Sequence, residues 1–342
     1  MRAVALLGLY AGERDVRRFQ MPGVNLVSGN ELDPTDQPDA ALIFGGDGTI
    51  HRYLSGLVLK QIPTLIVPLG SANDFAQSIG VPTLAKSLAA WQRFCTVGDN
   101  VKAIDLGTIQ PLTGAPSSEG STGVGPASQG ESPETLHFIP QGPRRDLPQM
   151  RARIMQSQLR HRTEAGSELA GTAFFCCIAG TGLDAAVNRR ALRQSRWVRG
   201  HGGYILALLQ TLGGFHPPHI AVSVESAGVW QTRIDEPGFL IAAGNGPQYG
   251  NGMRLTHQAC MDDGLLDLCF VRLLGKARLL RLFRVVYKGR HLGMKEVEYF
   301  PAQRLRIVTE PVMEVFADGE YICRTPVEIG IRRDALRIIV AR

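Results

Sequence analysis

Apolar and polar positions in the first hundred residues alternate in blocks that are typical of strands followed by helices. The predicted strands are 3–9, 40–44 and 63–67, and the predicted helices are 49–60 and 83–94. Short apolar strands alternating with helices indicate a parallel sheet covered by helices. We therefore expect an α/β domain with a Rossmann-like parallel sheet over residues 1–108.

From Gly171 onward, short segments of β character dominate the pattern. The predicted strands are 172–178, 219–225, 238–243, 266–272, 303–309, 313–317 and 336–340, and the predicted helices are 185–199 and 276–288. Many strands with few helices favour a second domain that is a mostly antiparallel β-sandwich. We assign it residues 169–325, and we treat 326–342 as a segment that can return to the N-terminal domain.

A segment of different composition separates the two patterns. Of the 23 residues from 111 to 133, 14 are Gly, Ser or Pro, and an Arg-rich stretch follows from Arg144 to Arg162. Such a composition buries too little apolar surface to order itself. We expect residues 109–168 to be a largely disordered insertion.

Composition narrows the class of protein without choosing a function. The chain has 342 residues, 44% hydrophobic content and a formal net charge of +6, which suits a globular protein with an anionic partner. No apolar segment approaches the roughly 20 residues of a membrane helix. Its six cysteines include no Cys-x-x-Cys pair, so a reducing cytoplasm fits better than a zinc or disulfide framework.

The strand at 40–44 ends in the glycine turn Gly45-Gly46-Asp47-Gly48-Thr49. Without Cβ atoms, the backbone N–H groups of such a turn can approach phosphate oxygens. Asp47 would repel a phosphate unless a cation or a proton lies between them. The turn therefore indicates metal–nucleotide chemistry, and the alternative is a tight turn in which Asp47 caps the next helix.

A second turn of this kind, Gly70-Ser71-Ala72-Asn73-Asp74, follows the strand at 63–67. Ligands of parallel sheets bind at the carboxyl ends of strands, where both turns fall. We expect them to form two walls of one phosphate pocket, although Asn73 and Asp74 could instead cap a helix.

Two acidic turns follow in the second half of the chain. Asp262-Asp263-Gly264 could be a hairpin turn or a Mg²⁺ ligand, because Mg²⁺ prefers carboxylate and carbonyl oxygens. Asp318-Gly319-Glu320 alone predicts a hairpin between strands at 313–317 and 321–323.

Taken together, these elements resemble the diacylglycerol kinase catalytic-domain family, especially bacterial lipid kinases related to diacylglycerol, sphingosine and ceramide kinases. The matching pieces occur in the family's order: GGDGT (45–49), PLGSANDFA (68–76), IDLG (104–107), GLDA (182–185), GNG and GNGMRL (244–255), MDDGLLD (261–267), GRH and EYF (289–300), and DGE (318–320). They cover nearly all of the chain outside the insertion.

The resemblance implies ATP- and Mg²⁺-dependent phosphorylation of a lipid hydroxyl in a cleft between the two domains. The implied nucleotide-binding residues are Gly45, Gly46, Asp47, Gly48, Thr49, Gly70, Ser71, Ala72, Asn73 and Asp74. Asp47 would act in catalysis and form an acidic network with Asp74 and Asp105. Glu320 would be the base that takes the hydroxyl proton.

For the metal, the resemblance implies Asp263 as a ligand of a further Mg²⁺, with the carbonyls of Cys260 and Leu265 as its companions. For partners, it implies a lipid at an anionic membrane surface and no nucleic acid, and it leaves a homodimer open. The expected location is cytoplasmic, with peripheral membrane contact as an open alternative.

Two basic helical stripes agree with membrane contact, although a packed helix with a solvated basic face is the commoner case. The stripe residues are Arg189, Arg193, Arg196 and Arg199 on one helix, and Lys276, Arg281, Arg284 and Lys288 on the other.

The nucleotide half departs from the family pattern at two places. Leu7-Gly8-Leu9-Tyr10-Ala11-Gly12 stands where the family usually has Asn-Pro-x-Ser-Gly, and His51-Arg52 stands where it often has Asn-Glu. Two alternatives therefore stay open: an NAD-kinase-like enzyme with a soluble substrate, and a non-catalytic lipid-binding relative with a weakened ATP site.

Overall fold

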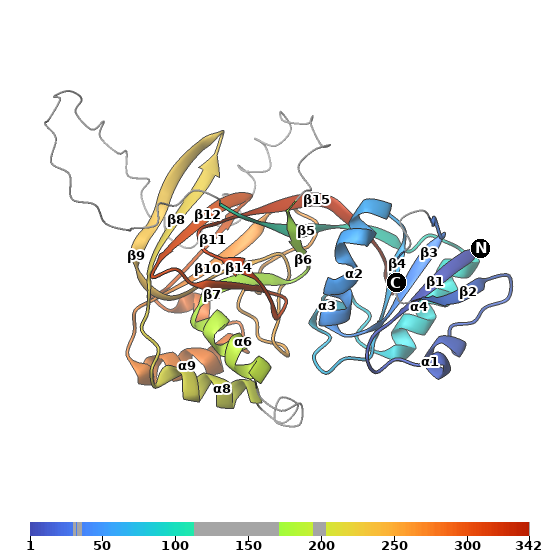
Figure 1. Ribbon diagram of the computed structural model, residues 1–342, viewed down its shortest axis with the longest axis horizontal. Coiled ribbons are helices and arrows are strands. Elements are labelled where there is room, and N and C mark those ends of the chain that lie inside the picture. Colours follow the sequence, from blue (N-terminus) through green and yellow to red (C-terminus); the bar gives the residue numbers. More distant parts are fainter. Residues whose placement is uncertain (30–31, 33–35, 113–170, 194–202, 342) are drawn as a thin grey trace, which may run out of the picture.

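The computed structural model describes residues 1–29, 32, 36–112, 171–193 and 203–341. These residues form an N-terminal part of parallel strands with helices and a C-terminal part of mostly antiparallel strands (Figure 1), which confirms the expected α/β fold class. Of the expected insertion, 109–112 are described, and 109–111 belong to a strand. The prediction for 113–168 lies outside the described residues.

The N-terminal sheet has the order β2-β1-β3-β4, with all strands parallel. Its strands are β1 (Arg2–Leu7), β2 (Asn25–Gly29), β3 (Ala40–Gly45) and β4 (Thr64–Pro68), and its helices are α1 (Glu13–Arg17), α2 (Asp47–Lys60), α3 (Asp74–Ser78) and α4 (Leu84–Thr96). β3 is buried at every position, as its unbroken apolar run predicts. The chain leaves β1 toward β2 on one side and returns to β3 on the other, so a ligand crevice is expected at the carboxyl ends of β1 and β3.

The C-terminal part is a two-layered sandwich. Its strands are β6 (Ala173–Phe175), β7 (Ile178–Gly182), β8 (His219–Ser226), β9 (Val229–Gly244), β10 (Leu266–Arg272), β11 (Val297–Ala302), β12 (Arg304–Glu310), β13 (Glu314–Ala317) and β14 (Glu320–Arg324). The first half of β9 pairs with β8 and its second half with β7 and β10, so this strand passes from one layer to the other. A buried cluster that includes Phe175, Ile241 and Phe270 fills the space between the layers.

The predicted strand 172–178 is wrong in one respect, because it is two strands. β6 and β7 are separated by Cys176 and Cys177, whose backbone N–H groups donate to the carboxylate of Asp318 at 2.6 and 2.9 Å. The carboxylate of Asp318 thus accepts the hydrogen bonds that a neighbouring strand would accept in a continuous sheet.

Two long strands join the domains. β15 (Val327–Ile339) pairs along its length with β5 (Val101–Pro111), and its first half also pairs with β12 of the sandwich. Near its end, Ile338 pairs in parallel with Thr64 of β4. The C-terminal strand therefore completes the N-terminal sheet as well as the sandwich (Figure 1).

Helices α6 (Leu183–Arg193), α8 (Gly203–Leu212) and α9 (Lys276–Val286) lie together at one end of the sandwich (Figure 1), and a short helical turn, η2, spans His291–Gly293. The predicted helix 185–199 is described only to residue 193, so Arg196 and Arg199 lie outside the described residues. On α9, Leu279, Leu282 and Val286 are buried, while Arg281 and Arg284 are exposed, which is the pattern of a packed amphipathic helix. Among the described helices, none has the length and apolar character that crossing a membrane requires.

Candidate functional site

The two glycine turns of the N-terminal domain pack against each other, backbone to backbone. A Cβ atom added to Gly46 would lie 2.9 Å from the Cα atom of Gly70, and one added to Gly70 would lie 2.5 Å from the Cα atom of Gly46. The N–H group of Leu69 also donates to the carbonyl of Gly45 at 3.0 Å. Glycine is thus required at both positions for this approach, so the two turns lie side by side. That they form one phosphate pocket stays a prediction.

Asp47 ties the first turn to the second. It is the first residue of α2, and its carboxylate accepts N–H donors from Asp74 and Phe75 at the start of α3, both at 3.2 Å. Burial, together with the charges of Asp74 and Asp318, raises the pKa of Asp47 to about 6. Three carboxylates within electrostatic reach are an arrangement that a cation would stabilise.

Asp74 connects the N-terminal domain to the sandwich. Its side chain is 4% exposed and accepts N–H donors from Asn251 at 2.8 Å and Gly252 at 2.9 Å. Burial raises the pKa of Asp74. The second glycine turn therefore holds the GNGMRL segment of the other domain in place.

The remaining residues of the second turn shape its backbone. Asn73 has a left-handed conformation with φ of +55°, and its side chain bonds both the N–H and the carbonyl of Gly70, at 2.9 and 2.8 Å. Ser71 is exposed and Ala72 is half-buried. Asn73 stands at the N-cap position of α3, but its side chain closes the glycine turn on itself and makes no capping bond to the helix.

Thr49 supports the first turn from the side of β1. A Cβ atom added to Gly8 or Gly45 would lie 2.5 or 2.4 Å from its Oγ1 atom. The segment that departs from the family pattern therefore still contacts the GGDGT turn through Gly8. Beyond it, Leu9 and Tyr10 are 74% and 69% exposed.

Asp105, the third carboxylate of the expected acidic network, lies on β5. Its carboxylate accepts N–H donors from Gly264 at 2.7 Å and Asp334 at 2.8 Å, and burial raises its pKa. Asp105 thus positions the MDDG turn, whereas Asp47 and Asp74 meet at the glycine turns.

The three residues expected to hold a further metal ion lie on this MDDG turn. The Asp263 carboxylate accepts the N–H of Leu265 at 3.0 Å, Leu265 is buried, and Cys260 is exposed. Within the described residues, no three His, Cys, Asp or Glu side chains are grouped closely enough to hold a metal ion. The Mg²⁺ ligand set therefore stays a prediction.

The DGE turn lies against the GGDGT turn from the opposite domain. A Cβ atom added to Gly48 would lie 3.0 Å from Oε1 of Glu320, and Glu320 is exposed. Asp318 has φ of +49° and holds the turn by accepting N–H donors from residues 176–178 at 2.6 to 3.1 Å. The structure thus brings Glu320 to the first glycine turn, across the boundary between the domains.

Sequence reasoning missed two residues that assemble this boundary. The amide of Asn245 donates to the carbonyls of Asp105 and Cys176 at 2.8 and 2.9 Å, which links β5 to the β6–β7 connection. The sequence predicts Asp318 only as part of a hairpin turn, whereas in the structure its carboxylate accepts hydrogen bonds from three backbone amides. Asn245 lies in the GNG motif and Asp318 in the DGE motif. The motifs alone do not predict which segments of the chain these side chains will bond.

A narrow apolar cavity lies behind this boundary, inside the second domain. It has a volume of about 20 Å³ and lies between α6, α9 and strands of the sandwich. Its lining consists of Asp184, Val187, Leu240, Tyr249, Met253, Leu255, Val271, Leu279, Leu282, Phe283 and Val286. Tyr249 donates to the carboxylate of Asp184 at 2.5 Å, so the polar lining residues satisfy each other.

Two family descriptions match the chain in succession. The diacylglycerol kinase catalytic domain matches residues 12–109, and the YegS C-terminal NAD kinase beta sandwich-like domain matches residues 177–340. The two matched regions fall on the parallel-sheet part and the sandwich part of the fold.

Proteins with similar sequences are described as diacylglycerol kinases. A diacylglycerol kinase of Mycobacterium tuberculosis strain H37Rv is 28% identical over 304 residues, which is 89% of this chain and 77% of the relative. A diacylglycerol kinase of Bacillus subtilis is 22% identical over 288 residues, covering 83% of this chain and 71% of the relative.

A solved structure of a diacylglycerol kinase from Bacillus anthracis superimposes with a TM-score of 0.62 at 18% identity, over 99% of this chain and 96% of that one. At this identity the superposition establishes the shared fold. Together, the two matched domains and the similar proteins show that the chain belongs to the diacylglycerol kinase catalytic-domain family, with a YegS-type C-terminal domain.

Proposed function

We propose that this protein transfers a phosphoryl group from ATP, with Mg²⁺, to a hydroxyl group of a lipid. The observation that carries the proposal is the meeting of the DGE and GGDGT turns, with Glu320 Oε1 3.0 Å from the Cβ position of Gly48. Phosphoryl transfer requires positioning and charge neutralisation more than covalent help from the protein. A phosphate-binding turn facing an exposed carboxylate is suited to that task.

The residues around the glycine turns fit a nucleoside triphosphate. Gly46 and Gly70 are half-buried and Gly48 is exposed, so backbone at the carboxyl ends of β3 and β4 is accessible to a ligand. Mg²⁺ carried by the triphosphate would be stabilised here, because the charges of Asp74 and Asp318 raise the pKa of Asp47 and a nearby cation would lower it. ATP would supply the phosphoryl group, and these residues would orient it.

Glu320 would orient the acceptor hydroxyl and take its proton. It is exposed at the tip of the β13–β14 hairpin, where a substrate can reach it, and Asp318 fixes the turn beneath it. A carboxylate acting as a general base contributes about 10²- to 10⁴-fold to a rate.

The apolar cavity next to Asp184 supports a lipid as the acceptor. Apart from Asp184 and Tyr249, its lining is aliphatic, Met or Phe. At about 20 Å³ it is narrower than an acyl chain, so the proposal requires α9 to shift outward when a lipid enters. Which lipid is phosphorylated is left to the assay below.

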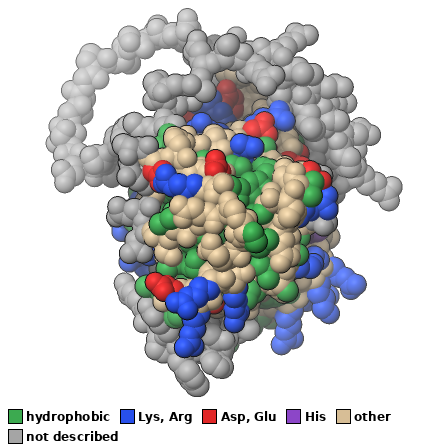
Figure 2. All heavy atoms as spheres, turned by 90° about the vertical axis from the view of Figure 1, so that its right-hand side faces the viewer, with side chains coloured by type: hydrophobic (Ala, Val, Ile, Leu, Met, Phe, Trp, Pro, Cys, Tyr) green, Lys and Arg blue, Asp and Glu red, His purple; other side chains and the backbone are tan. Residues whose placement is uncertain are grey.

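A membrane surface is the proposed source of the lipid, and the cytoplasm the proposed location. The net charge of +6 favours an anionic bilayer as partner. Figure 2 shows the end of the N-terminal domain, where Lys and Arg side chains gather along the lower edge of the view. A homodimer is compatible with the proposal and is not required by it.

The test is an assay of phosphate transfer from ATP to a panel of lipids in mixed micelles, including diacylglycerol, ceramide and sphingosine, with Mg²⁺ and with EDTA. We expect Mg²⁺-dependent transfer to at least one lipid and none to NAD. Transfer to NAD would instead favour the NAD-kinase-like alternative. Stabilisation of the protein by Mg²⁺ and ATP in thermal melts, without transfer to any acceptor, would favour the non-catalytic alternative.

A further inference from the structure

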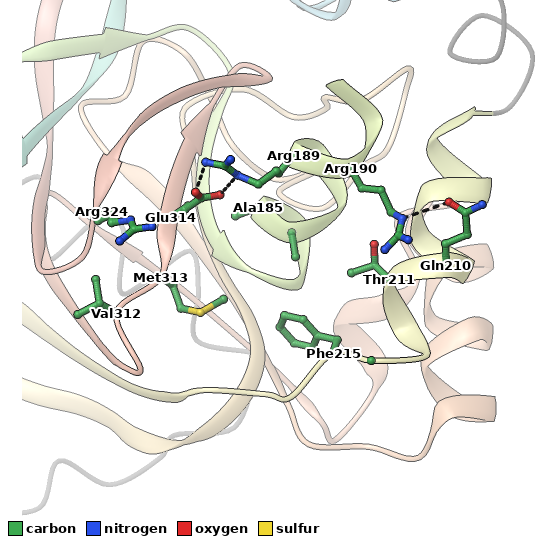
Figure 3. A pocket seen from close by; sticks show the side chains of 12 residues that line it. Ala185, Arg189, Arg190, Gln210, Thr211, Phe215, Val312, Met313, Glu314 and Arg324 are labelled. Atoms are coloured by element: carbon green, nitrogen blue, oxygen red, sulfur yellow. Dashed lines mark hydrogen bonds and ion pairs between the residues drawn. The ribbon is translucent and has the colours of Figure 1, made fainter. Parts of the chain in front are cut away.

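A second, larger cavity opens on the sandwich domain, away from the glycine turns. Its volume is about 770 Å³, and it lies between α6, the end of α8 and the β13–β14 hairpin (Figure 3). The lining residues are Ala185, Ala186, Arg189, Arg190, Gln210, Thr211, Gly214, Phe215, Val312, Met313, Glu314 and Arg324. This volume is in the range of sites that bind small molecules.

Positive charge predominates in this lining, with three arginines against one glutamate. Arg189 forms a two-pronged ion pair with Glu314, and its guanidinium lies 5.9 Å from the centre of the Tyr321 ring. These two contacts hold Arg189 in a fixed orientation at the cavity wall. Glu314 offsets one of the three positive charges.

The other two arginines are free of carboxylate partners within the described part of the chain. Arg190 donates to the neutral Oε1 of Gln210 at 3.1 Å. Arg324 is exposed and faces Glu314 in the register of β13 and β14, but Glu314 is already engaged by Arg189. Among the described residues, this cavity therefore has an excess of two positive charges.

The part of the lining between these arginines is apolar. Phe215, Met313 and Val312 extend below the arginines in Figure 3. Phe215 is held by a stacked contact with Phe239, with ring centres 6.1 Å apart. Val312 is 56% exposed, so its side chain is accessible to an apolar ligand. The cavity thus combines an anion-binding wall with an apolar floor.

We propose that this cavity binds a phosphate-bearing amphiphile, with its phosphate at Arg189 and Arg324 and its apolar chains on Phe215, Val312 and Met313. A phosphomonoester carries a charge of about −1.5 to −2 near neutral pH, which matches the excess of two positive charges that three arginines and one glutamate give this cavity. Arginine suits this role because its planar guanidinium binds phosphate oxygens in pairs. The bound phosphate would compete with Glu314 for Arg189.

This site is separate from the proposed catalytic one. Glu320 and Arg324 lie at opposite ends of β14, about 13 Å apart at the rise of a strand. A phosphate at Arg324 is therefore not the group that reacts at Glu320. The proposal stands on the cavity alone and does not require the chain to be a kinase.

The test is calorimetric titration of the full chain with dihexanoyl phosphatidic acid below its micelle concentration, and separately with inorganic phosphate and dihexanoyl phosphatidylcholine. We expect phosphatidic acid to bind at least about tenfold more tightly than either of the others.

Arg324→Gln should weaken the binding of phosphatidic acid about tenfold, and Val312→Asn about fivefold. Both residues are exposed, so neither change threatens the fold. Arg281→Gln, an exposed arginine of α9 outside this lining, is the matched control and should leave binding unchanged.

Two results would overturn the proposal. One is equal affinity for phosphatidic acid in the unmodified protein, Arg324→Gln and Arg190→Gln. The other is binding of inorganic phosphate as tight as that of phosphatidic acid, with no effect of Val312→Asn, which would indicate an anion site without a lipid component. Asp47→Asn should retain this binding whether or not the unmodified protein transfers phosphate, so the two proposals can fail independently.

Discussion

At the glycine turns, burial and the charges of neighbouring carboxylates together shift the pKa of Asp47. Its pKa of about 6 lies above the value of 3.8 for a free aspartate, because of burial and the neighbouring charges of Asp74 and Asp318. In the unfolded chain those causes disappear. Folding is therefore most favoured when Asp47 is protonated, and this contribution is lost as the pH rises from about 4 through about 6.

This linkage predicts the behaviour of Asp47→Asn. The free energy of unfolding should fall less steeply between pH 4 and pH 6 in the variant than in the unmodified protein, because the titrating group is gone. Phosphate transfer should be abolished, since an amide cannot supply the negative charge that attracts Mg²⁺. Urea unfolding at several pH values, with the lipid assay at pH 7, checks both. A folded and active Asp47→Asn protein would contradict the acidic metal network.

Glu320→Gln should lower kcat by about 10²- to 10⁴-fold and change the KM for lipid little, because glutamine keeps the size of the side chain but cannot accept the proton. Steady-state kinetics on the lipid identified by the panel measure the two constants. Glu310→Gln, at an exposed end of β12, is the control and should behave as the unmodified enzyme. Equal losses in kcat and lipid affinity for Glu320→Gln would assign Glu320 a structural role.

At this scale, the sequence identified residues but not their partners. The motifs named Asp47, Asp74 and Glu320, and the structure brings all three to the boundary between the domains. The links from Asp74 to the amides of Asn251 and Gly252 span 177 and 178 positions, and nothing local in the chain encodes them. For the same reason, the sequence does not reveal that Asp105 bonds the amides of Gly264 and Asp334.

Among the elements, the paired glycine turns give the clearest steric prediction. Gly46→Ala places a methyl group 2.9 Å from the Cα atom of Gly70, where backbone cannot yield without separating β3 from β4. We expect a loss of about 1 to 3 kcal/mol in unfolding free energy and a smaller thermal shift with Mg²⁺ and ATP. Gly12→Ala is the matched control, since nothing lies within 4 Å of its added methyl group. Equal stability of the two variants in thermal melts would contradict the close packing of the turns.

The strength of the apolar pattern decided which elements could be predicted. β3 is a continuous apolar run and was located within one residue, whereas α1 and α3 are five-residue helices too short to show a period. The first half of β9 is largely polar and exposed, and it is a strand because β8 pairs with it. Its pairing partner, rather than its own composition, determines its conformation.

For the whole molecule, the decisive feature is that β15 belongs to both domains. Sequence patterns indicated a parallel sheet and a sandwich, and the fold class was correct. They located only the end of β15, at 336–340, because its middle carries the charged residues Arg332, Arg333 and Asp334. Which strand completes which sheet is decided by tertiary packing.

Ile338→Ala should therefore weaken both domains together. Ile338 is fully buried and pairs with Thr64 of β4, so its truncation should cost about 2 to 4 kcal/mol. Hydrogen exchange should show equal losses of protection in β3 and in β8, and urea unfolding should remain a single transition. Loss of protection confined to β3 would mean that the two domains unfold independently.

The position of β15 late in the chain also bears on how the protein is made. Every other strand leaves the ribosome before β15 does, at about 5 to 20 residues per second. Until then, β4 has an open edge and β5 lacks its long partner. The nascent chain thus holds two incomplete sheets with unsatisfied backbone groups, which is the state that chaperones recognise and that aggregates when crowded. Both sheets can therefore be completed only after residues 327–339 have been synthesised.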